Sequence, residues 1–353
     1  MSRLRSLRTG AALAAAALTL PLLTVTSTAS AATQARSPAR DGGLPAHLFA
    51  PYFEAYLLGS PAALAAESGA RYLTLAFIQA PKKGSCTIDW NGDKSTPISW
   101  SVYGSDIAAI RVAGGDVIPS FGGYSADHDG TEIADSCHSV PKIAAAYESV
   151  ITTYNVTRLD LDTEDNSLTN KAGISRRNAA IRLVEQWAAR CHRRVQFVYT
   201  LPTNVAGLDP TGVSVLRSAV AHQARIDIVN IMTFDYYDNK PHEMARDTMT
   251  AAGHLLRTLH QLYPVKSPAQ LWHMIGVTEM IGIDDFGPPE VFKLSDGPVV
   301  VHWAIARGLG ELSFWALQRD NGGCPGTAGS NTCSGLKQPA WAFSHIFEPF
   351  TSR

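Results

Sequence analysis

The sequence predicts a single (β/α)8 barrel, a closed parallel sheet surrounded by helices. Short apolar runs alternate along the chain with runs of helical periodicity, which is the order that parallel β-α-β units produce. The strand candidates are almost continuously apolar, as parallel strands covered by helices usually are. Eight such units occupy about 300 residues, and a barrel of this kind typically needs ~250 residues plus loop insertions.

The strand candidates are taken from the apolar runs that begin at Leu48, Arg71, Asp116, Thr157, Arg194, Ile226, Leu271 and Glu311. The helical candidates cover 142–154, 176–191, 212–224, 242–262, 288–308 and 337–347. The alternative is an open doubly wound sheet, which normally carries a glycine-rich phosphate turn after its first strand. The run APYFEAYLLGSPA, which follows the start of the first candidate, has no such turn. The barrel is therefore the favoured fold.

The first 31 residues predict a secretory signal peptide. Three arginines precede an apolar run over 11–25, and small residues follow it up to Ala31, the layout of a leader that is cleaved on export. The alternative, a membrane anchor, needs about 20 apolar residues, and this run is shorter. We expect cleavage after Ala31 or Ala35, a flexible lead-in over 32–46 and a barrel over 47–353. The mature protein is then secreted and extracellular.

The charge of the chain argues against a nucleic-acid partner. The formal net charge is −1, and loss of the leader removes three arginines and no acids. No block of Lys and Arg occurs, so the basic footprint of nucleic-acid binding is missing. We expect a neutral ligand, no cofactor, no metal and no membrane contact after cleavage.

Five cysteines are an odd number for an exported chain, in which disulfides are expected. Cys324 and Cys333 flank a loop rich in Gly, Asn and Ser, and Cys86 and Cys137 lie in loop-like stretches. We expect the pairs Cys86–Cys137 and Cys324–Cys333, although spacing alone leaves the pairing open. Cys191 follows the apolar positions of its predicted helix at helical spacing and is expected to be a buried, inert thiol.

The run RLDLDTEDN, residues 158–166, concentrates carboxylates in a strand. Asp160, Asp162 and Glu164 are spaced by two, so they share one face of a strand, while Leu159 and Leu161 take the other. In a parallel barrel the carboxylate face points into the interior. Burial and like charge then raise the pKa of at least one acid, which can stay protonated near neutral pH and act as a general acid.

Three other interpretations of this run were weighed. A solvent-facing strand is common in antiparallel sheets but conflicts with the β-α alternation. A calcium loop needs a glycine where Asp165 stands and a glutamate where Lys171 stands. Another metal site would need histidine beside the acids, and none is there. Elsewhere the chain has no second histidine for a zinc helix, no G-x-S-x-G and no C-x-x-C.

Polar residues gather where the predicted strands end. The set is Ser120, Glu164, Asn204, Asp235 and Gln318. Active sites of (β/α)8 barrels lie at the carboxyl ends of the strands, so this pattern indicates a functional site at that end of the barrel.

Four motifs resemble those of glycoside hydrolase family 18, the chitinase family. The D-x-x-D-x-D-x-E motif of that family is present here over 157–164, S-x-G-G as Ser120–Gly123, and M-x-Y-D as Met232–Asp235. A closing tryptophan matches Trp315. The resemblance spans most of the predicted mature chain and is closest to secreted bacterial chitinases. It implies a monomeric, endo-acting hydrolase of chitin or N-acetylglucosamine oligosaccharides, retaining and substrate-assisted.

The resemblance also implies roles for individual residues. Glu164 would protonate the glycosidic oxygen, Asp162 would orient the N-acetyl group of the substrate, and Asp160 would share a proton with Asp162. Gly122 and Gly123 would allow a close approach of backbone and sugar. The residues expected to bind substrate are Trp315 as the floor under one sugar, Asp235 and Tyr236 near the acetamide, and also Ser120, Gly122, Gly123, Met232, Tyr52 and Gln79.

Two positions depart from the family pattern. Thr157 replaces the first Asp of the acid motif, which would shorten the charge relay. Phe234 replaces a tyrosine that binds the acetamide in many members, and Tyr236, expected on the same strand face, would supply that hydroxyl. Two other functions are compatible with the motifs. One is an endo-β-N-acetylglucosaminidase acting on glycoprotein glycans, and the other is a chitin-binding lectin without activity.

Overall fold

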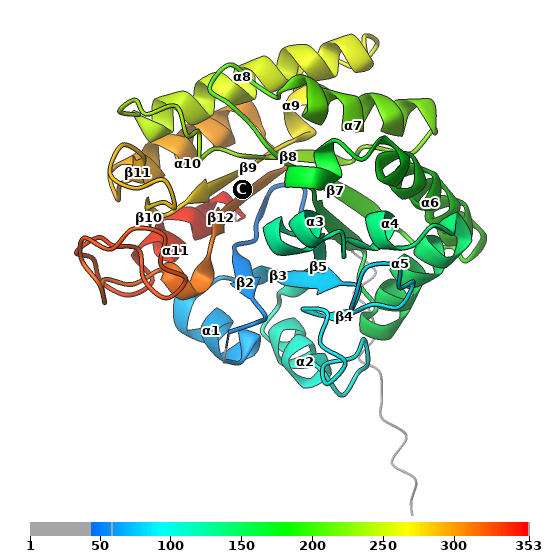
Figure 1. The fold of residues 1–353 in the computed structure, drawn as a ribbon. Coiled ribbons are helices and arrows are strands. Elements are labelled where there is room, and N and C mark those ends of the chain that lie inside the picture. The colour runs from blue at the N-terminus through cyan, green and yellow to red at the C-terminus, as the bar shows by residue number, and fades with distance from the viewer. Residues whose placement is uncertain (1–43, 58, 352–353) are drawn as a thin grey trace, which may run out of the picture. The chain divides into compact units, whose positions relative to one another are not determined.

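The closed parallel sheet is present in the computed structural model, which describes residues 44–57 and 59–351 (Figure 1). The predicted leader and residues 32–43 of the lead-in lie outside the described residues. The parallel strands are β1 (Leu48–Phe49), β2 (Tyr52–Glu54), β3 (Tyr72–Gln79), β5 (Asp116–Gly122), β6 (Arg158–Asp162), β7 (Gln196–Pro202), β8 (Ile228–Met232), β9 (Ile275–Met280) and β12 (Glu311–Trp315). They pair in the order β1-β12-β9-β8-β7-β6-β5-β3-β2, and the predicted barrel is confirmed.

The first predicted strand is divided into β1 and β2 around Pro51. Proline has no N–H to give to a ladder, so a strand is interrupted where it stands. β1 pairs in parallel with β12, and β2 pairs in parallel with β3. The two halves together close the barrel between its last strand and its second one.

Helices follow the strands as expected. The larger ones are α1 (Pro61–Ser68), α2 (Gly104–Val112), α5 (Val140–Tyr154), α6 (Lys171–Arg190), α7 (Pro210–Ala221), α8 (Met244–Leu262), α10 (Asp296–Arg307) and α11 (Ala342–Phe347). α6 begins earlier than its apolar pattern predicts because the side chain of Asn170 accepts the N–H of Gly173 and caps the helix there. The sequence analysis missed α1 and α2, which are short and carry little apolar periodicity.

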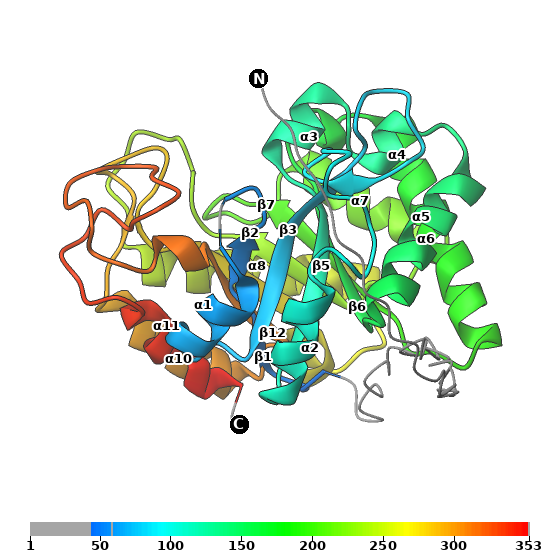
Figure 2. The same ribbon diagram turned by 90° about the horizontal axis from the view of Figure 1, so that it is seen from below.

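Smaller elements lie at the carboxyl end of the barrel. They are α3 (Tyr124–Asp129), α4 (Ile133–Ser136), β4 (Asp89–Trp90), which pairs with β3, and the hairpin of β10 (Gly282–Ile283) with β11 (Val291–Phe292). α9 (Pro268–His273) instead precedes β9. Figure 2 shows that α3, α4 and the loops around β10 and after β12 project from the same end of the barrel. The segments that could surround a substrate therefore come from several different strand ends.

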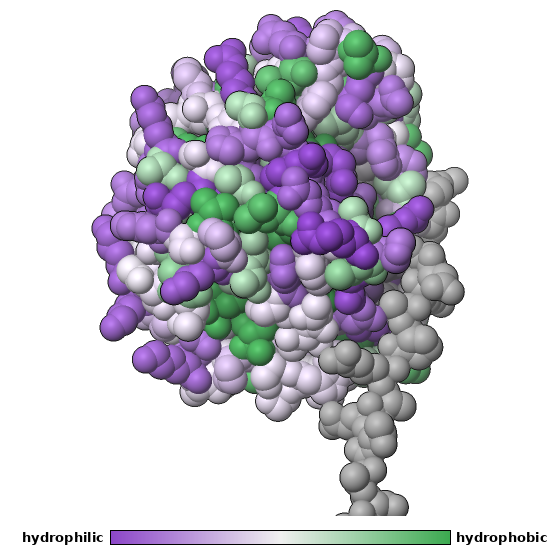
Figure 3. All heavy atoms as spheres, turned by 90° about the vertical axis from the view of Figure 1, so that its right-hand side faces the viewer, coloured by the Kyte–Doolittle hydropathy of each residue, from purple (hydrophilic) through white to green (hydrophobic). Residues whose placement is uncertain are grey.

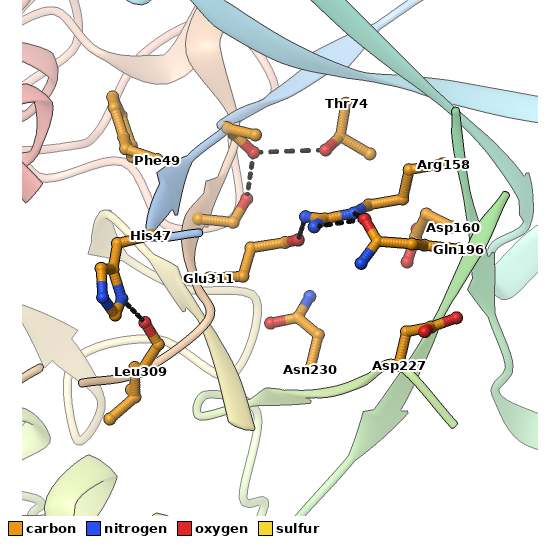
Figure 4. A network of polar contacts seen from close by, with 12 residues as sticks. His47, Phe49, Thr74, Arg158, Asp160, Gln196, Asp227, Asn230, Leu309 and Glu311 are labelled. Atoms are coloured by element: carbon orange, nitrogen blue, oxygen red, sulfur yellow. Dashed lines mark hydrogen bonds and ion pairs between the residues drawn. The ribbon is translucent and has the colours of Figure 1, made fainter. Parts of the chain in front are cut away.

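The amino end of the barrel interior holds a buried ion pair (Figure 4). Arg158 Nη1 donates to Glu311 Oε2 at 2.8 Å, and both side chains are 3% exposed. The other nitrogens of the guanidinium donate to Gln196 Oε1 at 2.9 and 3.2 Å. All three residues open their strands, so this polar layer lies at the opposite end from the loops described above.

On the face shown in Figure 3, hydrophobic residues form several areas with hydrophilic residues between them. Within the part of the chain that the structure describes, no helix combines the length and the apolar character needed to cross a membrane.

Both predicted disulfides are present, but the prediction for Cys191 is wrong. Cys86 is bonded to Cys137, and Cys324 to Cys333. Cys191 is an exposed free thiol. α6 ends at Arg190, and Cys191 caps its last turn, so the apolar periodicity that buries the face of the helix does not continue to this position.

Removing the Cys86–Cys137 disulfide should cost more stability than removing Cys324–Cys333. The bridged residues are 51 positions apart in the first case and 9 in the second. Loop-closure entropy in the unfolded chain then predicts losses of about 4 and about 2.5 kcal/mol for the paired Cys→Ser variants. Urea unfolding of both variants measures the difference, and an equal or reversed order would contradict the loop-length argument.

Candidate active site

One interior-facing acid of β6, Asp160, is held by a network of hydroxyl groups. Asp160 accepts hydrogen bonds from Ser120 Oγ at 2.6 Å, Thr200 Oγ1 at 2.5 Å and Tyr52 Oη at 3.0 Å. Burial raises the pKa of Asp160 to about 6, and the three hydroxyl donors partly offset that rise. Three donors on one carboxylate fix its position closely.

Asp162, the next interior acid, is less well satisfied. It is 4% exposed, and its Oδ1 is buried without a hydrogen-bond partner. Burial and the nearby charges of Glu164, Asp160 and Asp127 raise the pKa of Asp162 well above its ordinary value. A buried acceptor without a donor is costly.

Glu164 follows the end of β6 and is partly exposed. Burial first, and then the charges of Asp235 and Asp165, raise the pKa of its carboxyl to about 7, while the N–H of Tyr124 lowers it. Glu164 therefore retains a proton near neutral pH at a place that solvent can reach. These properties are those of a general acid.

Aromatic rings form a platform beside the acids. Trp315, at the end of β12, stacks on Phe77 with 5.6 Å between ring centroids and an angle of 12° between the planes. Tyr52 lies 5.6 Å from Trp315, centroid to centroid, and its hydroxyl reaches Asp160. One face of this cluster is partly exposed at Trp315, so a flat apolar ligand face could rest on the indole.

Gly122 and Gly123 allow close approaches within the protein, and the expected approach of a sugar stays a prediction. A Cβ on Gly122 would lie 2.0 Å from the carbonyl oxygen of Asp162, and one on Gly123 would lie 2.5 Å from the ring of Phe77. Both residues have positive φ, 99° and 83°. The close partners in the structure are parts of the protein, so these glycines let β5 pack against the acid strand and the aromatic platform.

Asp235 lies close enough to Glu164 to act on its charge. Among charged groups, Asp235 makes the largest contribution to the raised pKa of Glu164. Its own carboxyl has a pKa raised to about 7 by burial and by Asp285 and Glu290. Oδ1 of Asp235 accepts the N–H of Phe286 at 3.3 Å. The structure thus brings this predicted residue to the site.

The strand argument for Tyr236 is wrong. β8 ends at Met232, and Asp235 has a φ of 52°, so the alternation of faces does not continue to residue 236. The ring of Tyr236 packs on His242 with 4.7 Å between centroids, and its buried hydroxyl has no hydrogen-bond partner. The acids that raise its pKa are led by Glu279 and include none of β6.

The other residues predicted to bind substrate differ in what they contact. Ser120 and Tyr52 are buried and bond to Asp160, so they position that acid. Met232 is 7% exposed at the end of β8, and Gln79 is partly exposed and accepts a hydrogen bond from Thr131 at 2.9 Å.

Three further positions that the sequence singled out lie outside the acid network. Asn204 binds Asp209, and Gln318 binds the backbone of Glu54; both brace loops. Thr157 precedes β6 and lines a cavity of about 400 Å³ with Arg193. The expected shortening of the charge relay at Thr157 stays a prediction.

Thr200, Asn230 and Phe77 were missed by the sequence analysis. Asn230 Nδ2 donates to Thr278 Oγ1 at 2.7 Å and to Thr200 Oγ1 at 3.1 Å. A single polar residue in an apolar strand, in phase with the interior positions, was an available signal for Asn230 and Thr200. Phe77 had none, because the register of β3 against β5 shifts between Ala76 and Ile78, and such bulges redirect side chains.

The described residues hold no group of three or more His, Cys, Asp or Glu side chains arranged for a metal ion.

Comparisons with known proteins place this geometry in a family. No family model matches the chain. The chain is 34% identical over 323 residues to the probable bifunctional chitinase/lysozyme of Escherichia coli K12, covering 88% of this chain and 35% of that protein. It is 32% identical over 289 residues to endochitinase 11 of Metarhizium anisopliae, covering 78% of this chain and 53% of that protein. The chain therefore spans only about a third to a half of these relatives.

A solved structure matches over nearly its whole length. The catalytic domain of the hyperthermophilic chitinase of Pyrococcus furiosus is 33% identical, with a TM-score of 0.77, over 88% of this chain and 96% of that one. This chain belongs to glycoside hydrolase family 18. The acid motif, the S-x-G-G strand and the closing tryptophan of family 18 thus meet at one end of its barrel, on β6, β5 and β12.

Proposed function

We propose that this family 18 chain is a secreted, endo-acting chitinase that hydrolyses β-1,4 linkages between N-acetylglucosamine units with retention. The observation that carries the proposal is the arrangement of Glu164 and Asp162. The first is a partly exposed acid that keeps its proton near neutral pH, and the second is a buried acid with an unused acceptor oxygen. The catalytic-site mutants of the Pyrococcus furiosus chitinase were solved with chito-oligosaccharides bound, which supports this class of substrate.

The residues support a substrate-assisted reaction in two steps. In the first step, Glu164 gives its proton to the glycosidic oxygen while the acetamide oxygen of the substrate attacks the anomeric carbon. The leaving sugar departs as an alcohol, and an oxazolinium ring remains. In the second step, the Glu164 carboxylate takes a proton from water, which opens the ring at the anomeric carbon. Two displacements at one carbon retain its configuration.

Asp162 has a defined part in this scheme. Its carboxylate would accept the acetamide N–H and hold the acetamide oxygen toward the anomeric carbon, and its charge would stabilise the cationic ring. The hydroxyl-bound Asp160 would share a proton with Asp162, so the acids titrate as a set rather than singly. Trp315 would lie under the sugar ring that carries the acetamide.

Activity should fall as pH rises through about 7. Glu164 must be protonated for the first step, and its pKa is raised to about 7 by burial and by neighbouring acids. The protonated form therefore predominates below that pH and is lost above it. The pH profile of kcat/KM on a soluble chitin oligosaccharide measures this loss as its alkaline limb. A limb near the ordinary value of a glutamate, about 4.3, would contradict the assignment of Glu164.

The proposal is tested by incubating the protein with N-acetylglucosamine oligosaccharides and following product anomers by ¹H NMR. We expect new reducing ends that appear first as the β anomer. Initial α anomer would reject the retaining mechanism, and binding without new reducing ends would indicate a lectin. A glycoprotein glycan in a parallel reaction separates the endo-β-N-acetylglucosaminidase alternative. N-terminal sequencing of the exported protein tests secretion, with Ala32 or Arg36 expected as the first residue.

A further inference from the structure

A fourth carboxyl lies beside the three acids of the β6 motif. It belongs to Asp127 on α3, which is 0% exposed. Oδ2 of Asp127 accepts a hydrogen bond from the backbone N–H of Glu164. Its charge is also one of those that raise the pKa of Asp162. Asp127 therefore contacts the backbone of one acid and acts electrostatically on the next one.

Gly122 lies between Asp127 and the acid strand. A Cβ there would lie 2.0 Å from the carbonyl oxygen of Asp162, which is a clash, whereas its 3.5 Å separation from Asp127 Oδ1 is an ordinary van der Waals contact. Oδ1 of Asp127 is buried without a hydrogen-bond partner, so one oxygen of this carboxyl binds the N–H of Glu164 and the other is unpaired.

The segment that carries Asp127 is firmly held. The charged groups that face Asp127 are Glu132 at the start of α4, Arg177 of α6, and Asp162 and Glu164 themselves. Arg177 and Glu132 form a buried ion pair at 2.8 Å. Burial and the charge of Glu132 raise the pKa of Asp127 well above its ordinary value, although Arg177 lowers it.

The turn after Glu164 is attached to the same segment by a second contact. In that contact, Asp135 of α4 accepts the hydroxyl of Ser167 and the amide of Asn170. Ser167 is part of the short 3-10 helix that Glu164 precedes. The chain on the carboxyl side of Glu164 is thus fixed to α4, while its own N–H is fixed to α3.

We propose that Asp127 is a positioning residue, which fixes the backbone from which Glu164 projects and joins Asp160, Asp162 and Glu164 as a fourth carboxyl of one proton-sharing set. This inference rests on the proposed function. Two effects follow from the contact. The hydrogen bond to the N–H of Glu164 determines where the acid side chain begins, and a carboxylate behind Asp162 favours the protonated forms of its neighbours.

The matched variants are Asp127→Asn, Asp127→Ala and Asp129→Asn. Asparagine keeps an oxygen that accepts the Glu164 N–H but cannot ionise, whereas alanine removes both the acceptor and the ionisable group. Asp129 is an exposed residue of the same helix, so Asp129→Asn removes a carboxyl without touching the acids. We expect Asp127→Asn to lower the pKa of Asp162, which Asp127 raises, and Asp129→Asn to leave it in place.

The two roles give separate readouts. For Asp127→Ala we expect kcat to fall by about 10-fold to 100-fold with a smaller change in KM, since a displaced acid slows the reaction more than it weakens binding. An unshifted Asp162 titration in Asp127→Asn together with wild-type kcat in Asp127→Ala would overturn the proposal. If the alanine variant does not fold, the Asp162 titration in Asp127→Asn alone decides.

A measurement without substrate separates this inference from the proposed function. In protein labelled with ¹³C at the aspartate carboxyl, the Asp162 signal is assigned by its loss in Asp162→Asn and then titrated. A lower pKa of Asp162 in Asp127→Asn than in wild type and Asp129→Asn supports the set, and identical titrations reject it. If the wild-type protein cleaved no chitin oligosaccharide, the proposed function would fail, but this titration would still decide the coupling.

Discussion

Glu164→Gln lowers kcat on chitin oligosaccharides by about 10²-fold to 10⁴-fold, the contribution expected of a general acid, and leaves KM nearly unchanged. Glutamine has the shape of glutamate but has no acidic proton to give to the leaving oxygen. The backbone N–H contact with Asp127 does not involve the altered side chain, so the fold should be preserved. Steady-state kinetics on a soluble oligosaccharide, with circular dichroism of the same sample, measures both.

Glu67→Gln is the matched control. Glu67 lies exposed on α1, so the substitution is chemically identical but far from the acid network. We expect wild-type kinetics for that variant. Cleavage at the wild-type rate by folded Glu164→Gln would remove the basis of the proposed mechanism.

Glu311→Ala should lower the free energy of unfolding by about 3–5 kcal/mol, the range measured when one partner of a buried ion pair is removed. Arg158 is 3% exposed and would be left with a buried charge and only Gln196 as an acceptor. Burial raises the pKa of Glu311 to about 7 even though Arg158 lowers it, which indicates how poorly this end of the barrel solvates ions. Urea unfolding at neutral pH measures the loss.

Two comparisons show whether the cost comes from the unpaired charge. Replacing both partners, Arg158→Met with Glu311→Leu, should recover most of the lost stability because no charge remains buried. Asp238→Ala removes a partner of Lys240, whose side chain is 74% exposed, and should change stability by less than about 1 kcal/mol. A double variant no more stable than Glu311→Ala would contradict the explanation.

The fold was predictable because apolar and acidic residues alternate with the two-residue period of a strand. Leu159 and Leu161 alternate with Asp160 and Asp162. The structure places the two leucines in the main hydrophobic core and the two aspartates inside the barrel. Prediction failed where the chain leaves regular structure. Cys191 lies just past a helix end, so a periodicity argument that holds inside α6 did not apply to it.

The site was predictable only for the residues that strands supply. The acids of β6 and Trp315 stand at strand ends and carry a motif, whereas Tyr236 follows a left-handed residue that breaks the alternation. Asp127 comes from a helix that no sequence pattern places beside β6. Its position depends on tertiary contacts of α4 and α6, which no local pattern encodes.

The division of the first strand at Pro51 bears on the order in which the molecule can assemble. Within the described residues, β1 pairs with β12, with Leu48 opposite Glu311. An early strand therefore cannot pair until the last strand of the sheet has been synthesised. Until then β1 and β9 have unpaired edges, at which other chains can associate. The contact order of this closure is high, and such non-local pairing is slow. The seam between β1 and β12 is therefore the place where a nascent chain is most exposed to misassembly.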